Sequence, residues 1–355
     1  MSDIWREFNR GLGITHGLPS FGQFGNGGIG LTRGFVENFL MENGLPIYAT
    51  GSGYLSDDYI ADVRKNRDNR LFLFLKEPGQ RNLLTGSSAS GDEQPIEPNP
   101  LILGTDVSRT YNTGYALRKG NSFDAVQLQL GMNGGSYTGL VIFRGVEALL
   151  NYIEAYYERN GSLDATATKY WQEIRIRAKV DPDLDKTINA TIMTEEAKND
   201  WAAYSAGQLL TDRTLYNIRR ERRCELIGEG MRWFDLQRWR AMDQMLTTPY
   251  HIEGFKLWGP MQHWYDDQDG NSLLVYGLDN SSSRVSPPDR SIYIRPYEKV
   301  SGSLVLEGYR WSMAHYLNPI ALQDILITSI DNDLSTSPIY QNPGWPYMAN
   351  EGPIQ

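Results

Sequence analysis

One charged stretch decides how this chain folds: residues 219–239 have the sequence RRERRCELIGEGMRWFDLQRW. Apolar positions at helical spacing predict two helices here, over residues 215–227 and 231–245. Gly228-Glu-Gly230 separates them, because glycine readily adopts the left-handed backbone that ends a helix. The apolar side of the pair consists of Leu226, Met231, Phe234, Leu236 and Trp239.

The charged side chains of this stretch have two possible uses. Glu221 and Glu225 form a like-charge pair, whereas opposite charges lie three residues apart in Arg222/Glu225, Glu229/Arg232, Arg232/Asp235 and Asp235/Arg238. Such pairing holds carboxylates ionised, and glycosidase carboxylates normally come from separate strand or loop ends. A helical di-metal site would need a Glu-x-x-His motif, and the stretch has no histidine. We therefore expect a buried ion-pair network that locks two helices together, built from Glu221, Arg222, Glu225, Glu229, Arg232, Asp235 and Arg238, with Trp239 beside it.

Two earlier segments extend the helical region. An apolar stripe predicts a helix from about residue 140 to residue 158, ended by Gly161, and residues 165–179 predict an antiparallel partner stopped by Asp181-Pro182. We expect residues 195–208 to form a further helix. The spacing of the two helical hairpins resembles the ~34-residue period of tetratricopeptide repeats. The predicted fold is therefore mainly α, with tetratricopeptide-like helical hairpins, long loops and short β strands.

Irregular segments flank the helical region. Thr32 caps a predicted helix over residues 33–41, and residues 66–75 suggest a turn followed by a strand. Residues 25–30 match a dinucleotide-binding glycine pattern but lack the preceding strand, so we expect a plain glycine loop. We divide the chain into a loop-rich region with a short helix and strands (1–138), a helical region (139–245) and a loop-rich carboxy-terminal region (246–355), all within one domain.

Composition limits the classes of function. The 355 residues are 40% apolar and 22% charged, which is enough apolar material for a buried core. The net charge of −9 argues against nucleic acid, whose phosphates need a basic surface. A single cysteine excludes an internal disulfide framework and a cysteine-rich zinc module. No secretory signal opens the sequence and no window approaches the ~18 apolar residues of a membrane span, which alone would suggest a soluble intracellular protein.

Five motifs in the same order resemble the SusD/RagB family of outer-membrane nutrient-binding lipoproteins of Bacteroidetes. The most specific is Glu221-Arg-Arg-x-Glu-Leu-x-x-Glu-Gly-x-Arg-Trp-x-Asp-Leu-x-Arg-Trp239. The others are Arg144-x-x-Glu147-x-Leu-Leu-Asn-Tyr-x-Glu154-Ala with Ile174-Arg-x-Arg-Ala178, Thr32-Arg-x-Phe-Val with Gly44-Leu-Pro, Asn66-Arg-Asp-x-Arg70, and Gln341-Asn-Pro-Gly-Trp345. Departures from the family pattern occur at Cys224, at Gly228 and in residues 318–321, and they leave the ion-pair pattern intact.

The resemblance implies a non-catalytic protein on the extracellular face of the cell outer membrane. Such a protein captures a glycan and passes it to a SusC-like TonB-dependent transporter for import, without a cofactor. Membrane attachment would come only from a lipid anchor that this sequence does not carry. The match covers the carboxy-terminal part of a typical member, which suggests part of a longer chain. A peptide- or protein-binding member of the same scaffold is the alternative, and a glycoside hydrolase is a third possibility.

Aromatic side chains in polar loops are the candidates for ligand contact, because the flat C–H faces of sugars stack on such rings. The candidates are Trp258, Trp264, Tyr265, Phe24, Tyr54 and Tyr111, with Phe21 in a similar loop. Each of these rings could instead pack beneath its own loop. Trp171, Trp233 and Trp239 lie on predicted helix faces, so we expect them in the core.

No metal site is expected. Asp267-Gln-Asp269-Gly-Asn271 matches the start of a calcium loop, but Ser272 stands at its glycine position and Leu278 at its glutamate position. A hairpin turn at Asp269-Gly270 explains the motif as well. The four histidines, at positions 16, 251, 263 and 315, lack metal-ligand spacing, and we expect Cys224 to be a packing residue.

Overall fold

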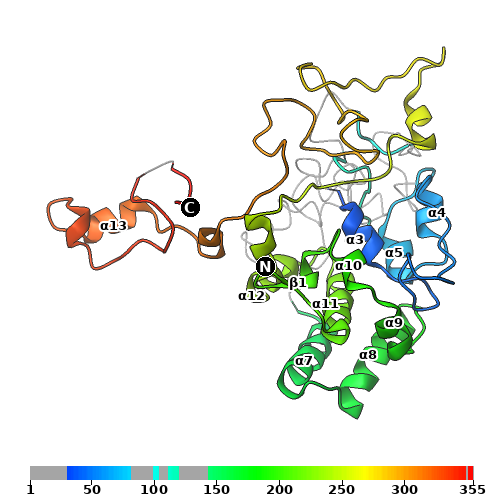
Figure 1. Ribbon diagram of the computed structural model, residues 1–355, viewed down its shortest axis with the longest axis horizontal. Coiled ribbons are helices and arrows are strands. Elements are labelled where there is room, and N and C mark those ends of the chain that lie inside the picture. The colour runs from blue at the N-terminus through cyan, green and yellow to red at the C-terminus, as the bar shows by residue number, and fades with distance from the viewer. Residues whose placement is uncertain (1–29, 81–98, 104–110, 120–142, 349–350, 355) are drawn as a thin grey trace, which may run out of the picture.

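The computed structural model describes residues 30–80, 99–103, 111–119, 143–348 and 351–354. Its helices gather around α11 (Arg213–Glu225), which packs against α7, α9, α3 and the short helix η2 (Figure 1). Asp212 starts α11 by accepting hydrogen bonds from the backbone N–H groups of Thr214 and Leu215. Nearly all of its residues from Tyr216 onward are buried, so this highly charged helix lies at the centre of the described fold.

Helices α7 (Gly145–Asn160) and α8 (Ala165–Arg177) form the predicted antiparallel hairpin. Gly161 ends α7 in the left-handed conformation, with φ of 68°, and Asp164 caps α8. The helices close over an apolar cluster that α11 completes, consisting of Val146, Leu150, Ile153, Ala167, Trp171, Ile174, Leu184, Ile218 and Leu226. The prediction of this hairpin is confirmed, although α8 ends earlier than expected because Lys179 adopts a φ of 54°.

The break after α11 is also where the sequence places it. Gly228 and Gly230 have φ values of 70° and 77°, and α12 (Met231–Arg238) follows. The predicted extension of this helix to residue 245 is wrong: Arg240 takes a φ of 47°, and the chain continues as the 3-10 helix η3 (Asp243–Leu246). The turn allows Trp239, Ala241, Met242 and Met245 to pack in one cluster against Ala202 and Leu236.

Two other predicted elements are wrong. Residues 69–74 form a helix, α5 (Asn69–Phe74), because the side chain of Asp68 caps its first turn. Leu71 and Leu75 lie one helical turn apart and are buried, whereas Phe72 and Leu73 between them are exposed. Residues 195–208 do not form one helix. They are divided among α10 (Met193–Glu196), η2 (Trp201–Ala203) and a two-stranded hairpin of β1 (Tyr204–Ser205) and β2 (Gln208–Leu209), which turns at Ala206 and Gly207. Helix α9 (Leu184–Ala190) precedes them.

A second apolar core lies under the loops. Thr32 caps α3 (Arg33–Asn38) as predicted, through its hydroxyl oxygen and the N–H of Phe35. Helix α4 (Ile60–Arg64) and the 3-10 helix η4 (Pro260–Tyr265) border the same core. Its buried members include Phe35, Val36, Phe39, Ile60, Leu71, Leu75, Tyr115, Phe255, Leu257 and Met261. This core contains residues of both the first and the third predicted regions.

The carboxy-terminal segment extends away from the other helices (Figure 1). It contains η5 (Met313–Tyr316), α13 (Leu322–Thr328) and η6 (Leu334–Thr336). The motif Gln341-Asn-Pro-Gly-Trp345 folds back onto η5, where the indole N–H of Trp345 donates to the carbonyl oxygens of Ala314 and Leu317 at 3.0 and 2.9 Å. Among the described residues, no helix has the length and hydropathy needed to cross a membrane.

Candidate functional site

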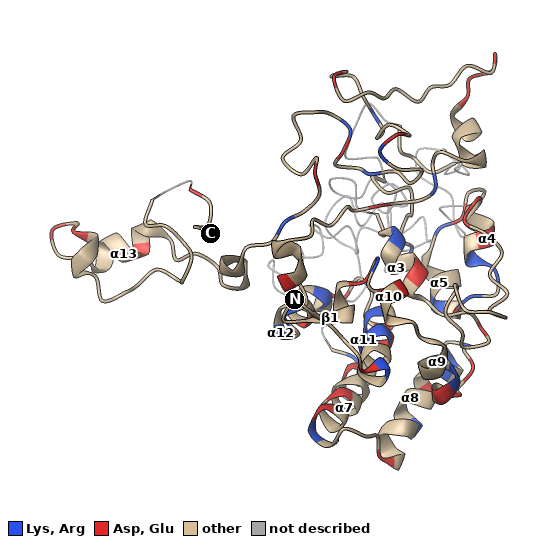
Figure 2. Cartoon of the chain, viewed as in Figure 1, with Lys and Arg blue, Asp and Glu red and all other residues tan. Residues whose placement is uncertain are grey.

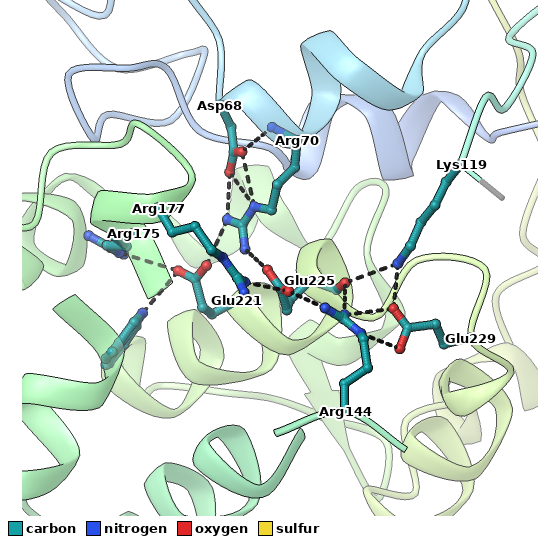
Figure 3. Close-up of polar contacts among 10 residues, drawn as sticks. Asp68, Arg70, Lys119, Arg144, Arg175, Arg177, Glu221, Glu225 and Glu229 are labelled. Atoms are coloured by element: carbon teal, nitrogen blue, oxygen red, sulfur yellow. Dashed lines mark hydrogen bonds and ion pairs between the residues drawn. The ribbon is translucent and has the colours of Figure 1, made fainter. Parts of the chain in front are cut away.

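The ion-pair network of α11 has Glu221 and Glu225 at its centre (Figure 3). Glu221 accepts from the indole Nε1 of Trp171 at 2.9 Å, and pairs with Arg70 at 2.7 Å and Arg175 at 3.3 Å. All of these groups are buried. Helices α5, α8 and α11 therefore meet at a single carboxylate.

Glu225 and Glu229 extend the network towards α7. Glu225 pairs with three arginines, Arg70, Arg144 and Arg177, at 3.0, 3.0 and 2.5 Å. Arg144, the residue before α7, also contacts Glu229 at 2.6 Å, and Lys119 contacts the same carboxylate. Charged residues of both signs thus lie along the helices around α11 (Figure 2), and the network ties distant segments together.

The pairing differs in detail from the local pairs that the sequence suggested. Asp235 does pair with Arg238, at 2.9 Å, but Arg222 reaches Asp235 at 2.7 Å across the break between α11 and α12. Arg232 pairs with Asp200 at 2.6 Å. The predicted pairs Arg222/Glu225, Glu229/Arg232 and Arg232/Asp235 are thus replaced by contacts across the fold. The buried network itself is confirmed.

The pKa values of two buried carboxylates in this region indicate a structural role rather than proton transfer. Burial alone would raise the pKa of Glu221, but Arg70 and Arg175 outweigh it and lower the pKa to about 2. Asp200 is likewise buried, and Arg223 and Arg232 lower its pKa to about 2. A general acid needs a pKa near neutral, so neither carboxylate is tuned for glycoside cleavage.

The predicted ligand aromatics fall into two groups. Trp258 and Trp264 are partly exposed and border the second apolar core. Tyr54 is also partly exposed, beneath the guanidinium of Arg67. Tyr111 and Tyr265 are buried at 2% and 5% exposure, and the hydroxyl of Tyr265 donates to the carbonyl oxygen of Pro100. Neither buried ring offers a face to a ligand here, and Phe24 and Phe21 lie outside the described residues.

The core tryptophans follow the prediction in two cases of three. Trp171 is fully buried and Trp239 is 5% exposed. Trp233 is 46% exposed and meets Trp311 edge to face, with ring centroids 5.9 Å apart, so its assignment to the core is wrong. The sequence pattern places Trp233 on α12, but the described structure leaves that face of the helix open.

Two exposed tyrosines that no sequence pattern indicated lie against the predicted tryptophans. Tyr59 is 41% exposed and lies against Trp264, with ring centroids 6.0 Å apart. Tyr276 is 46% exposed and meets Trp258 edge to face at 4.9 Å. Lys256 reaches Asp57 and Asp58 at 3.1 and 2.7 Å beside them. We call Tyr59, Trp258, Trp264 and Tyr276 the aromatic platform; Tyr59 comes from a segment about 200 residues before the other three.

Two cavities lie away from this platform. One of about 510 Å³ lies between α3, η2 and the α11–α12 break, and the other, of about 970 Å³, lies between α12 and η5. The first has a mainly apolar lining that includes Phe35, Trp201, Leu226, Trp233 and Tyr250. Neither cavity can be recognised from sequence patterns, because each is formed by segments distant along the chain.

The segment resembling a calcium loop is a hairpin turn. Asp266 and Ser272 form an isolated bridge, Gly270 has a φ of 82°, and Asp267 accepts from the backbone N–H groups of Asp269 and Asn271. The described part of the chain contains no group of three or more His, Cys, Asp or Glu residues arranged to hold a metal ion. Cys224 is buried at 2% exposure, as expected for a packing residue.

Comparisons with known proteins give one family. The family model for the SusD family matches residues 9–345. A solved structure of a SusD-like carbohydrate binding protein from Bacteroides fragilis NCTC 9343 is similar over 68% of this chain, with 22% identity and a TM-score of 0.38. This chain covers 41% of the length of that protein. No curated protein sequence matches. Because the family model spans almost the whole sequence, including every motif of the ion-pair network, the chain belongs to the SusD family.

Proposed function

We propose that this chain is a non-catalytic protein that captures a glycan at the aromatic platform. The observation that carries the proposal is the gathering of four partly exposed rings in two contacting pairs, Tyr59 with Trp264 and Trp258 with Tyr276. Sugar rings stack on such surfaces because their axial C–H groups form flat apolar faces. The SusD-like protein from Bacteroides fragilis is described as carbohydrate binding, which agrees with this use.

Polar groups beside the platform suit hydroxyl recognition. Asp57 accepts from the hydroxyl of Tyr293 at 2.5 Å and from Lys256 at 3.1 Å, and Asp58 accepts from Lys256 at 2.7 Å. Hydrogen bonds from Lys256 to Asp58 and Asp57 raise the pKa of Lys256, so the ammonium stays charged. Fixed donors and acceptors next to an apolar surface are the usual composition of a small-ligand site.

The cellular setting belongs to the same proposal. The protein acts at the extracellular face of the outer membrane, held there by a lipid anchor. It delivers the glycan to a SusC-like TonB-dependent transporter. The helical region around α11 provides the rigid scaffold, because the buried ion pairs fix its helices relative to one another.

Titration calorimetry of the purified chain against a panel of polysaccharides tests the proposal. The double variant Trp258→Ala, Trp264→Ala removes both platform tryptophans, and we expect at least a tenfold loss of affinity because each stacked ring contributes about 1 kcal/mol or more. Tyr340→Ala is the matched control, since Tyr340 is an aromatic residue that is 78% exposed on the carboxy-terminal segment.

Three results would contradict the proposal. If the platform variant and the native protein bind the polysaccharide with equal affinity, the platform is not the binding site. Capture of peptides with no oligosaccharide binding would favour the peptide-binding alternative. Release of reducing sugar by the purified protein would establish a glycosidase.

A further inference from the structure

Two cations near one half of the aromatic platform form no ion pair. Arg284 is exposed and Lys299 is partly buried. Within the part of the chain that the structure describes, neither side chain has an ion-pair or hydrogen-bond partner. The arginines between them along the chain differ, since Arg290 and Arg295 both pair with Glu298, at 3.0 and 3.2 Å. The charges of Arg284 and Lys299 therefore remain available to a ligand.

A backbone hydrogen bond places Arg284 beside the segment that carries one platform ring. The N–H of Arg284 donates to the carbonyl oxygen of Val275 at 2.8 Å. The next residue, Tyr276, is 46% exposed and meets Trp258 edge to face, with ring centroids 4.9 Å apart. Arg284 thus borders the half of the platform that Trp258 and Tyr276 form.

Lys299 approaches the same segment from a later part of the chain. Two residues after it, the N–H of Ser301 donates to the carbonyl oxygen of Leu278 at 2.8 Å. Burial, together with the neighbouring charge of Arg284, lowers the pKa of Lys299. The two cations therefore lie close enough to repel each other, and an anion in contact with both would relieve this repulsion.

The other half of the platform has the opposite charge. Its ring of Tyr59 directly follows Asp57 and Asp58, which share the single ammonium group of Lys256 at 3.1 and 2.7 Å. Two carboxylates against one ammonium leave an excess negative charge there, which disfavours an anionic group on a ligand. The platform is therefore electrostatically polar, with its cationic end at Tyr276.

We propose that the glycan captured at the platform is anionic, and that its carboxylate or sulfate group lies at Arg284 and Lys299. This inference rests on the proposed glycan capture and names the class of glycan. The sugar ring that carries the charge packs against Trp258 and Tyr276, and the neighbouring sugar lies over the other half of the platform. Arginine suits this role because its planar guanidinium can donate to two oxygens of one carboxylate or sulfate.

Titration calorimetry on the full chain tests the inference with polysaccharides that differ in charge. Polygalacturonate is compared with its fully methyl-esterified form, and dextran sulfate with dextran, so the two pairs distinguish a carboxylate from a sulfate. We expect the charged member of one pair to bind about fivefold more tightly, because exposed charge pairs contribute modestly. The preference should shrink as salt is added, since salt screens exposed charges. The net charge of −9 would by itself produce the reverse preference.

Variants locate the anionic group. The double variant Arg284→Met, Lys299→Met removes both cations, and we expect it to abolish the preference for the charged polysaccharide. It should fold normally, as judged by circular dichroism, because neither side chain has a described partner to lose. Arg284→Lys keeps the charge and should retain most of the preference. The matched control is Arg159→Met, Lys169→Met, which removes two exposed cations of the α7–α8 hairpin and should bind like the native protein.

The results separate this inference from the proposed function. If Trp258→Ala, Trp264→Ala weakens binding but charged and neutral polysaccharides bind the native protein equally, glycan capture stands and the anionic class is wrong. If no polysaccharide binds, glycan capture is wrong and this inference falls with it. A preference for charged polysaccharide that survives the loss of Arg284 and Lys299 would overturn their assignment.

Discussion

Arg238 holds Glu154 with both terminal nitrogens, Nη1 to Oε1 and Nη2 to Oε2, each at 2.6 Å. Trp239 donates its indole N–H to the same carboxylate, also at 2.6 Å. The planar guanidinium matches two carboxylate oxygens at once, which makes this a strong form of ion pair. Two neighbouring residues at the end of α12 thereby fix that helix against α7.

Glu154→Gln should lower the free energy of unfolding by about 1–2 kcal/mol, since buried Glu154 loses the charge that strengthens its hydrogen bonds from Arg238 and Trp239, whereas Arg238 keeps its ion pair with Asp235. Urea unfolding followed by circular dichroism measures the change. Glu173→Gln provides the control, because Glu173 forms an exposed pair with Lys169 at 3.8 Å and exposed pairs contribute about 0.5 kcal/mol or less. Similar losses in the two variants would show that the Glu154 contacts add little to stability.

Stability should fall in acid. The folded-state pKa is about 2 for Glu221 and for Asp200, below the ordinary values of 4.5 and 3.8. The unfolded chain therefore takes up protons first, and the stabilisation present above about pH 5 is lost progressively towards pH 2. Glu37 contributes with the opposite sign, because burial raises its pKa.

The pH effect has a direct test in Glu221→Gln. Urea midpoints measured between about pH 6 and about pH 3 should decline less steeply in this variant than in the native protein, because one depressed carboxyl is gone. The variant should also be less stable near neutral pH, since Arg70 and Arg175 lose their shared charge. An unchanged pH slope would show that Glu221 does not titrate as described.

Substitution by alanine should destabilise the protein to different extents at two glycines that have similar backbone angles. Gly230 has a φ of 77° and open space around an added Cβ, so Gly230→Ala should cost only the backbone strain, about 1 kcal/mol. Gly114 has a φ of 75°, and its added Cβ would lie 2.2 Å from Cδ1 of buried Phe255. Gly114→Ala should therefore cost about 3 kcal/mol or more in urea unfolding. Equal costs would mean that the ring of Phe255 moves aside freely.

Cys224 should resist alkylation in the native protein. Its side chain is 2% exposed, and burial raises the pKa of the thiol, so the reactive thiolate is scarce. Mass spectrometry after iodoacetamide treatment should show little modification in buffer and complete modification in urea. Rapid labelling without urea would indicate that α11 opens locally, against the tight packing seen here.

Local signals in the sequence were sufficient for the elements whose ends depend on neighbouring residues. Gly161 ends α7 and Thr32 caps α3 as predicted, because both effects act within one turn of the chain. The network around Glu221 was predicted because most carboxylates of the stretch have an arginine three residues away and no histidine accompanies them, which favours ion pairs over a catalytic or metal site. The partners of Glu221 could not be predicted, because Arg70 comes from a segment that shares no local pattern with α11.

Other elements depended on tertiary packing. The LFLF run of α5 alternates poorly with polar residues, so it suits a strand or a helix equally, and the Asp68 cap decides for the helix. Trp233 occupies a helical apolar position, yet nothing in the sequence shows which face of α12 is covered. Tyr59 could not be recognised because it contacts Trp264, about 200 positions further along the chain, and Tyr276 because no local pattern shows that its ring meets Trp258.

The three arginines on Glu225 have a consequence for how the chain acquires its structure. Arg70, Arg144 and Arg177 precede Glu225 by 155, 81 and 48 positions. Contacts of such long range close slowly, because the ends of a long loop must first meet. During synthesis all three cations leave the ribosome before their common anion. The earlier segments therefore remain without this electrostatic tie until α11 emerges, and the stretch that characterises the family is also the one that closes the network.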